Sequence, residues 1–146
     1  MGACATSPER EEPRVKITYH DKTKTDPNKL WPDTGLKEAF ERYWTLRFDG
    51  RSGEALSIEA PYFREMVFLK RYQSFIEGYS VSKLKLKGIE IWDIVAQTDK
   101  FLIIRCEISY AKSGESKKFF VKDRWVNVRG VWYHVIRDRI LFPTAL

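Results

Sequence analysis

Between residues 34 and 78, apolar positions recur every three or four residues, which is the spacing of amphipathic helices. A first helix of about four turns is predicted over residues 34–48, where Asp33 or Thr34 can cap the first turn and Gly50 can end the last. Its apolar side consists of Leu36, Phe40, Tyr43, Trp44 and Phe48. A short helix over residues 52–58 and a third helix over residues 61–78, opened by Pro61, follow it.

From Ser80 onward the apolar period changes to two, which is the spacing of β-strands. The predicted strands cover residues 81–98, 101–112, 117–128 and 131–140, with short hairpin connections between them. Gly88 marks an expected bulge, because the apolar positions before and after it are out of phase. The order of elements predicts the α+β class, with three N-terminal helices packed on a strongly curved four-stranded antiparallel sheet.

Residues 5–33 are rich in proline, threonine and charged residues, and their prolines break any helix. Within this segment, residues 14–19 alternate polar and apolar positions, which fits an edge strand or a solvated linker equally well. We therefore divide the chain into a flexible N-terminal tether over residues 1–33 and one α+β domain over residues 34–146.

The composition suits a packed domain, since 43% of the 146 residues are hydrophobic and 14% are aromatic. No apolar run reaches the roughly 20 residues that a membrane-spanning helix needs. The net charge of +6 is spread along the chain, and Lys83, Lys85 and Lys87 alternate on one predicted strand. Nucleic acid is not favoured as a partner, because no base-stacking aromatics accompany these lysines and lysine also protects exposed strands from edge pairing.

The two cysteines have different surroundings. Cys106 shares a strand face with Leu102, Ile104 and Ile108, which predicts a small buried apolar residue. Cys4 follows a small residue and precedes a polar, proline-bearing stretch, which resembles the processing point of a bacterial lipoprotein, although no signal-peptide core precedes it in this sequence. We expect lipidation at Cys4 and a periplasm-facing location in the cell envelope, anchored to the membrane by lipid, with a cytoplasmic protein as the alternative.

A family resemblance depends on three segments. The third helix begins with Ala60-Pro61-Tyr62-Phe63-Arg64, and the final hairpin contains Asp123-Arg124-Trp125-Val126 and Gly130-Val131-Trp132-Tyr133-His134-Val135. Together with the order of elements, they resemble the nuclear transport factor two-like (cystatin-like cone) superfamily over about residues 34–142. The resemblance implies a cone-shaped fold but no single function, because that superfamily includes ketosteroid isomerase, scytalone dehydratase, carriers, scaffolds and members of unknown role.

The implied cone would have bulky residues around its open end. Its predicted lining consists of Phe40, Tyr43, Trp44, Tyr62 and Phe63. Side chains of this size favour a cone that is filled rather than one that holds a ligand.

His134 is the sharpest catalytic candidate, because imidazole titrates near neutral pH and its strand can face the cone. It needs an acidic partner, and Asp93, Asp123 and Asp138 all lie on predicted strands. A histidine on an exposed or subunit-facing strand explains the same pattern. No metal site is predicted, since the two histidines and two cysteines lack ligand spacing, and no cofactor is predicted without a phosphate-binding loop.

The sheet surface is a candidate protein interface. Phe101, Ile103 and Arg105 share the face opposite Cys106, and the second strand of the interface is expected to add Phe119, Val121 and Trp125. A mixed aromatic and charged surface suits protein contacts, so we predict a homodimer formed through the sheet face, with an envelope protein as a further partner.

We therefore expect a non-catalytic binding or assembly module of the bacterial cell envelope. The alternative is a small-molecule isomerase, dehydratase or hydrolase that uses His134 within the cone. A roomy, polar cavity beside His134 favours the enzyme, whereas a cone filled by Trp44 and Phe63 favours the module.

Overall fold

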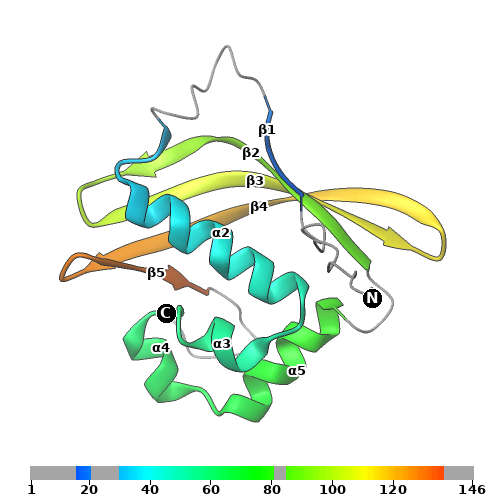
Figure 1. The fold of residues 1–146 in the computed structure, drawn as a ribbon, viewed down its shortest axis with the longest axis horizontal. Coiled ribbons are helices and arrows are strands. Elements are labelled where there is room, and N and C mark those ends of the chain that lie inside the picture. The colour runs from blue at the N-terminus through cyan, green and yellow to red at the C-terminus, as the bar shows by residue number, and fades with distance from the viewer. Residues whose placement is uncertain (1–15, 21–29, 81–84, 137–146) are drawn as a thin grey trace, which may run out of the picture.

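The computed structural model describes residues 16–20, 30–80 and 85–136. Its strands are β1 (Lys16–Tyr19), β2 (Lys85–Gln97), β3 (Phe101–Lys112), β4 (Glu115–Val128) and β5 (Val131–Val135). Its helices are α2 (Thr34–Phe48), α3 (Ser52–Leu56), α4 (Pro61–Met66) and α5 (Leu69–Ser80) (Figure 1). The first helix and the last hairpin therefore lie where the apolar periods predict them.

The sheet differs from the predicted four-stranded antiparallel one, which is wrong. It has five strands in the order β1-β2-β3-β4-β5, and it is mixed, because β1 runs parallel to β2 while all other neighbours are antiparallel. The strand interpretation of the alternating segment is confirmed for residues 16–19. The alternation alone could not distinguish an edge strand from a solvated linker. That choice depends on whether a strand distant in the sequence offers an edge for pairing. Predicted strand residues 81–84 and 137–140 lie outside the described residues.

The prediction of three helices is also wrong, because residues 61–78 form two helices rather than one. The break falls at Val67, whose backbone is extended (φ −117°, ψ 137°) and whose side chain joins the core with 9% exposure. No proline or glycine marks this position, so the helical period continues through it. Burial of Val67 prevails over the local helix preference.

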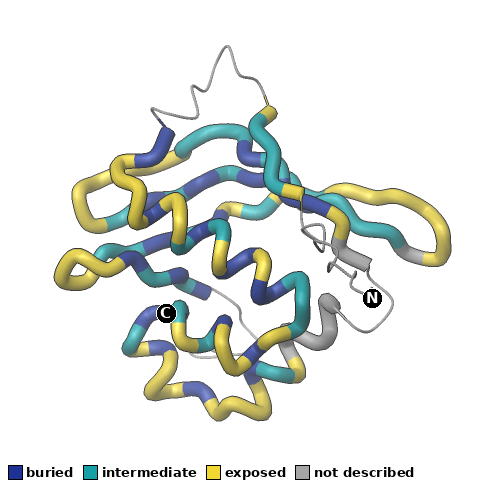
Figure 2. The backbone as a smooth tube through the Cα atoms, in the orientation of Figure 1, coloured by how far each residue is buried: buried dark blue, intermediate teal, exposed yellow. Residues whose placement is uncertain are grey.

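Helix α2 crosses one face of the sheet, which we call the inner face (Figure 1). Asp33 caps α2 by accepting a hydrogen bond from the Leu36 N–H at 2.8 Å, as predicted. Every second residue of β3 points inward and is buried, which confirms the predicted burial of Cys106 (Figure 2). These β3 residues are Leu102, Ile104, Cys106 and Ile108.

Strand β2 has three register shifts against β3, and the first, between Leu86 and Gly88, confirms the bulge predicted at Gly88. A Cβ atom at Gly88 would lie 2.9 Å from the Lys16 carbonyl oxygen, so glycine permits the close approach of β1. The two-residue turns at Ser113-Gly114 and Arg129-Gly130 have positive φ at both positions. This is the type I′ geometry that joins adjacent strands tightly.

Candidate functional site

His134 lies in the core at the centre of a polar cluster, which we call the His134 cluster. Strand β5 turns His134 to the inner face, and the segment before α4 pairs with it on its other side. The His134 N–H donates to the Ile58 carbonyl and the Ala60 N–H donates to the His134 carbonyl, each at 2.8 Å. These two backbone bonds place Glu59 directly beside the imidazole ring.

Two carboxylates hold the ring of His134, one from each side. Nδ1 lies 2.8 Å from Glu59 Oε1, and Nε2 lies 2.7 Å from Asp123 Oδ1 on β4. The ring also stacks on that of Tyr43, with centroids 4.0 Å apart. The histidine is thus fixed in position by three residues that are distant from one another in the sequence.

The remaining carboxylate oxygens have protein donors as well. Glu59 Oε2 accepts hydrogen bonds from the Tyr43 hydroxyl at 2.6 Å and the Tyr72 hydroxyl at 2.7 Å. Asp123 Oδ2 accepts from the indole N–H of Trp125 at 2.7 Å and from that of Trp44 at 3.0 Å. Every carboxylate oxygen and both ring nitrogens therefore have a partner.

The surroundings favour a protonated histidine. Burial alone would lower the pKa of His134, but the negative charges of Glu59 and Asp123 and the hydrogen bonds to both raise that pKa from 6.5 to about 9. Burial raises the pKa of the Tyr43 hydroxyl well above its ordinary value, so that hydroxyl stays a donor. Arg47, also buried, donates from Nη1 to the Tyr43 hydroxyl at 3.2 Å and brings a second positive charge near Glu59.

This arrangement leaves no free ring nitrogen for proton transfer to a substrate. His134 and Asp123 are each 4% exposed and Glu59 is not exposed at all, so the cluster is shielded from bulk solvent. A general acid or base must reach the proton that it transfers, directly or through one water. In this closed geometry the cluster connects α2, α5, β4 and β5 and has no face toward a ligand among the described residues.

The predicted cone-lining residues do not all behave alike. Phe40, Tyr43, Trp44 and Phe63 are buried in the core, with exposures of 4% or less. Phe40 and Tyr43 of α2 pack against Trp125 of the sheet, and Phe63 of α4 packs against Tyr72 of α5. Tyr62 is 54% exposed and lies outside this core. Its neighbour Phe63 takes the inward position because successive helical residues point about 100° apart.

Sequence reasoning named Asp123 among three acidic candidates, and the structure selects it. Asp93 instead pairs with Arg105 on the opposite face of the sheet, and Asp138 lies outside the described residues. Reasoning from sequence did not find Glu59, Arg47 or the role of Tyr72. The one signal for Glu59 in the sequence is its place between two apolar residues, Ile58 and Ala60. An acidic residue at the solvent-exposed end of a helix would give the same pattern.

The predicted interface residues fall on two different faces, so this part of the prediction is wrong in its geometry. Trp125 pairs with Leu102, Val121 with Cys106 and Phe119 with Ile108, and directly paired residues share a face. These three β4 residues therefore lie on the inner face, where Trp125 is fully buried. Phe101, Ile103 and Arg105 lie on the other face, which we call the outer face, and each is partly exposed.

An aromatic and charged cluster occupies the middle of the outer face. Arg105 forms two 3.1 Å hydrogen bonds with the Asp93 carboxylate, and its guanidinium lies over the rings of Trp92 and Phe120 at 5.4 and 5.8 Å. The ring of His20, at the end of β1, stacks on Trp92 with centroids 3.4 Å apart. Phe120 remains 52% exposed, so this cluster is accessible.

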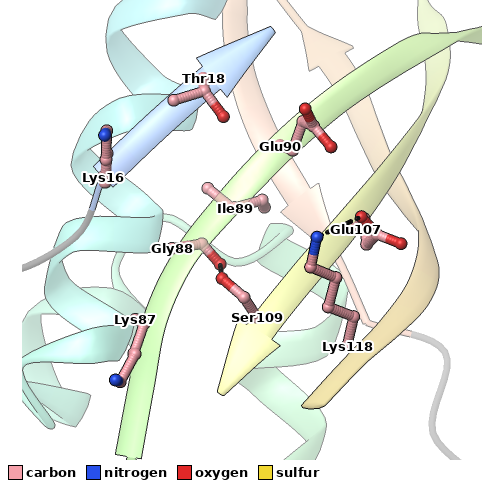
Figure 3. A pocket seen from close by; sticks show the side chains of 9 residues that line it. All are labelled: Lys16, Thr18, Lys87, Gly88, Ile89, Glu90, Glu107, Ser109 and Lys118. Atoms are coloured by element: carbon pink, nitrogen blue, oxygen red, sulfur yellow. Dashed lines mark hydrogen bonds and ion pairs between the residues drawn. The ribbon is translucent and has the colours of Figure 1, made fainter. Parts of the chain in front are cut away.

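A shallow groove of about 260 Å³ lies beside this cluster, where β1 meets β2 (Figure 3). Glu90, Glu107, Lys118 and Ser109 are among its lining residues, and the Lys118 ammonium points to Glu107 at 3.8 Å. Lys87 points away from the centre of the groove. Opposite charges therefore neutralise each other here, and the groove has no concentrated charge for an ionic ligand.

Comparison with known proteins identifies structures of similar fold but indicates no function. No family model matches this chain, and no curated protein matches it. A SEC-C motif containing protein from Psychrobacter arcticus is similar in structure, with a TM-score of 0.54, 9% identity, and coverage of 92% of this chain and 75% of that chain. A SEC-C motif containing protein from Rhodopseudomonas palustris also has a TM-score of 0.54, with 8% identity over 67% of this chain and 73% of that one. At these identities the likeness concerns the fold alone.

These matches correct the predicted resemblance. The similar solved structures are described as SEC-C motif containing proteins, so the assignment to the nuclear transport factor two-like or cystatin-like superfamily is wrong. The segments that suggested it specify a tryptophan-rich hairpin and a proline-started helix, and neither feature is restricted to one family.

Two further features of the described residues bear on chemistry and location. No group of three or more histidine, cysteine, aspartate or glutamate side chains in these ranges is arranged to hold a metal ion. Within the same ranges, no helix combines the length and the apolar character that crossing a membrane requires.

Proposed function

We propose that this protein is a non-catalytic assembly module that pairs with a second copy of itself through the outer face of its sheet. The observation that supports a non-catalytic role is the closed His134 cluster, in which each acidic or basic atom is already bonded to another protein group. The enzyme alternative would need solvent or substrate at His134, which is 4% exposed.

The outer face has the chemistry of a protein contact. Trp92, Arg105 and Phe120 form a compact cluster at its middle, and tryptophan and arginine are enriched where interfaces are strongest. The bidentate Asp93–Arg105 pair holds the guanidinium in one orientation, which lowers the entropy cost of binding there.

The distribution of charge across the outer face favours a second copy as the partner. Glu90 and Asp93 lie on β2, whereas Lys122 and Arg124, which pair with β3 residues of the outer face, lie on β4. A two-fold axis parallel to the strands would set β2 of one copy opposite β4 of the other. Acidic and basic side chains would then face each other twice, as an isologous interface requires.

Sedimentation velocity of the full chain tests this proposal. The protein should form a dimer as its concentration rises, and added salt should weaken the dimer because opposite charges contribute to it. Trp92→Ser and Glu90→Lys should each raise the dissociation constant about tenfold or more. Lys70→Glu, an exposed change on α5, should have no effect. A wild-type protein that stays monomeric at every concentration, or dimers indifferent to both β2 variants, would refute the proposal.

We further propose that the module acts in the bacterial cell envelope, attached to a membrane by a lipid at Cys4. This rests on the sequence around Cys4, which lies outside the described residues. A cytoplasmic location is the alternative, and an envelope protein is the further partner that this location suggests.

A further inference from the structure

The edge of strand β4 carries an inference that goes beyond self-association. β4 runs from Glu115 to Val128, but β5 pairs only with its last part, from Arg124 onward. Within the described residues, nothing pairs with residues 116–122 on the side away from β3. This part of β4 belongs to the β3–β4 hairpin, which extends beyond the end of β5 (Figure 1).

The backbone groups along this edge point outward at every second residue. In a two-residue hairpin the residues that flank the turn form a hydrogen-bonded pair, and such pairs alternate along an antiparallel ladder. Val128 pairs with Val131 and Glu115 pairs with Lys112 across such turns, so odd-numbered residues of β4 bond to β3 and even-numbered ones face the β5 side. The N–H of Asn127 donates to Lys100, which agrees with this assignment.

No strand of the described residues pairs with this side of residues 116–122, and we call this stretch the free edge of β4. Its even-numbered residues are Ser116, Lys118, Phe120 and Lys122, and their side chains stand on the outer face. Their N–H and C=O groups thus form a row that can accept another strand. Lys118 and Phe120 are 66% and 52% exposed, and Lys122 is also exposed. An added strand would meet alternating ammonium and aromatic groups.

We propose that residues 116–122 of β4 bind an extended acidic segment of a partner protein by strand addition. Backbone hydrogen bonds would provide the affinity, and side chains that alternate along the added strand would provide the specificity. An acidic residue in register with Lys122 would face opposite charge, which stabilises cross-strand pairs, and one in register with Lys118 would share that ammonium with Glu107, which lies 3.8 Å from it. This partner rests on the proposed assembly role, and Phe120 and Lys122 belong both to the outer-face surface and to this edge.

A second copy of β4 fits this edge poorly in the register centred on Phe120. Antiparallel pairing of two β4 strands centred on Phe120 would set Lys118 of each copy opposite Lys122 of the other. Like charges directly opposite each other destabilise a strand pair, and lysines on an edge prevent self-pairing for this reason. The same lysines attract an acidic strand, so the charge pattern selects the partner.

Titration with a labelled extended peptide tests the proposal directly. The probe alternates threonine and glutamate over about seven residues, the length of an ordinary strand. A peptide of the same length with lysine in place of glutamate is the control. With the full chain, fluorescence anisotropy should show binding of the acidic peptide only, weakened about tenfold when salt rises from about 30 mM to about 300 mM.

Two substitutions at one position separate the charge from the backbone. Lys118→Gln removes one charge and should weaken binding of the acidic peptide a few-fold. Lys118→Pro also removes an outward N–H, which a free edge tolerates, and should abolish binding while the sheet stays intact. Lys70→Glu serves as the charge control on α5 and should leave binding unchanged.

Amide hydrogen exchange identifies the occupant. In the free chain the amides of Lys118, Phe120 and Lys122 should exchange rapidly, and the acidic peptide should protect them. Slow exchange of these amides in the free monomer would mean that a segment of the same chain already covers the edge, and protection that grows with protein concentration would mean a second copy. Either result would overturn the proposal, as would equal binding of both peptides.

The self-association proposal and the strand-addition proposal can be refuted independently. Glu90 lies on β2, which β3 separates from β4, and its backbone does not take part in pairing at the free edge, so a monomeric Glu90→Lys protein should still bind the acidic peptide. Peptide binding without any dimer would refute only the self-association, and a dimer without peptide binding would refute only the edge proposal.

Discussion

At the scale of single residues, His134 shows how one buried charge depends on its partners. A buried ion that loses its partner is costly, on the order of 3–5 kcal/mol, because the remaining charge is left without compensation. Here one imidazolium and the nearby guanidinium of Arg47 offset two carboxylates. Four neutral donors from tyrosine and tryptophan complete the hydrogen bonding of both carboxylates.

The raised pKa of His134 predicts a loss of stability in alkaline solution. The folded state holds the proton up to a pKa of about 9, whereas the unfolded chain releases it near 6.5. The stabilisation is therefore complete below pH 6.5 and disappears as the pH rises through 9, a change on the order of 3 kcal/mol in the free energy of unfolding. Urea unfolding measured at a series of pH values checks this decline, and NMR titration of the His134 ring gives the pKa directly.

Two controls isolate the histidine in that measurement. Burial also raises the pKa of the Cys106 thiol, which acts in the same direction above pH 8, so the series is repeated in Cys106→Ala. His134→Gln should be less stable at neutral pH and should lose most of the decline between pH 6.5 and 9. A His134 pKa near 6.5 in the folded wild-type protein would contradict the charged cluster.

At the scale of elements, the contact between β1 and β2 depends on a residue without a side chain. β1 pairs with only four residues of β2, from Gly88 to Ile91, so its attachment is short. The close approach of the Lys16 carbonyl to Gly88 leaves no room for a Cβ atom. Their pairing could not be predicted from local pattern alone, since the two segments are about seventy residues apart in the sequence.

Gly88→Ala should therefore weaken the attachment of β1. The added methyl group would lie 2.9 Å from a backbone oxygen, and relief of this contact requires a backbone shift, with a cost of about 1–3 kcal/mol in the free energy of unfolding. Urea unfolding gives this cost, and faster amide exchange in β1 locates it. Gly53→Ala is the matched control, because nothing lies within 4 Å of its Cβ position and helix propensity favours alanine there. Equal stability of Gly88→Ala and wild type would show that the approach is not tight.

At the scale of the whole molecule, the His134 cluster joins both layers of the fold. Its members come from α2, the segment before α4, α5, β4 and β5, so the helices and the sheet share one set of buried hydrogen bonds. Among the described residues, the outer face and the edge of β4 lie outside this buried connection. The assembly role proposed above follows from this division between a closed interior and an accessible sheet.

The attachment proposed at Cys4 is a property of the whole molecule in its cell. Intact mass spectrometry of the protein purified from its native host should show the mass of attached acyl chains, and peptide mapping should place them at Cys4. Cys4→Ser should abolish both the added mass and the recovery of the protein with membranes, because stable anchoring needs these chains. An unmodified Cys4 in the native protein would contradict the envelope location.

The sequence by itself determined the features that depend on near neighbours. The apolar spacing from Leu36 to Phe48 predicted α2, the alternation around Cys106 predicted a buried strand face, and the phase change at Gly88 predicted a bulge. Each of these features follows from the spacing of apolar side chains along a short segment, and this spacing does not depend on which surface the segment packs against. They are confirmed because helical and strand periods are properties of the backbone.

Tertiary structure alone decided the partners. Glu59 and His134 are 75 residues apart in the sequence, β1 pairs with a strand far along the chain, and the break at Val67 arises from burial rather than from a helix-breaking residue. The face on which Phe119, Val121 and Trp125 lie also depended on the register between β3 and β4. A shift of this register by one residue would move all three side chains to the other face. Contacts between distant segments are chosen by packing of the whole chain, and no local period encodes them.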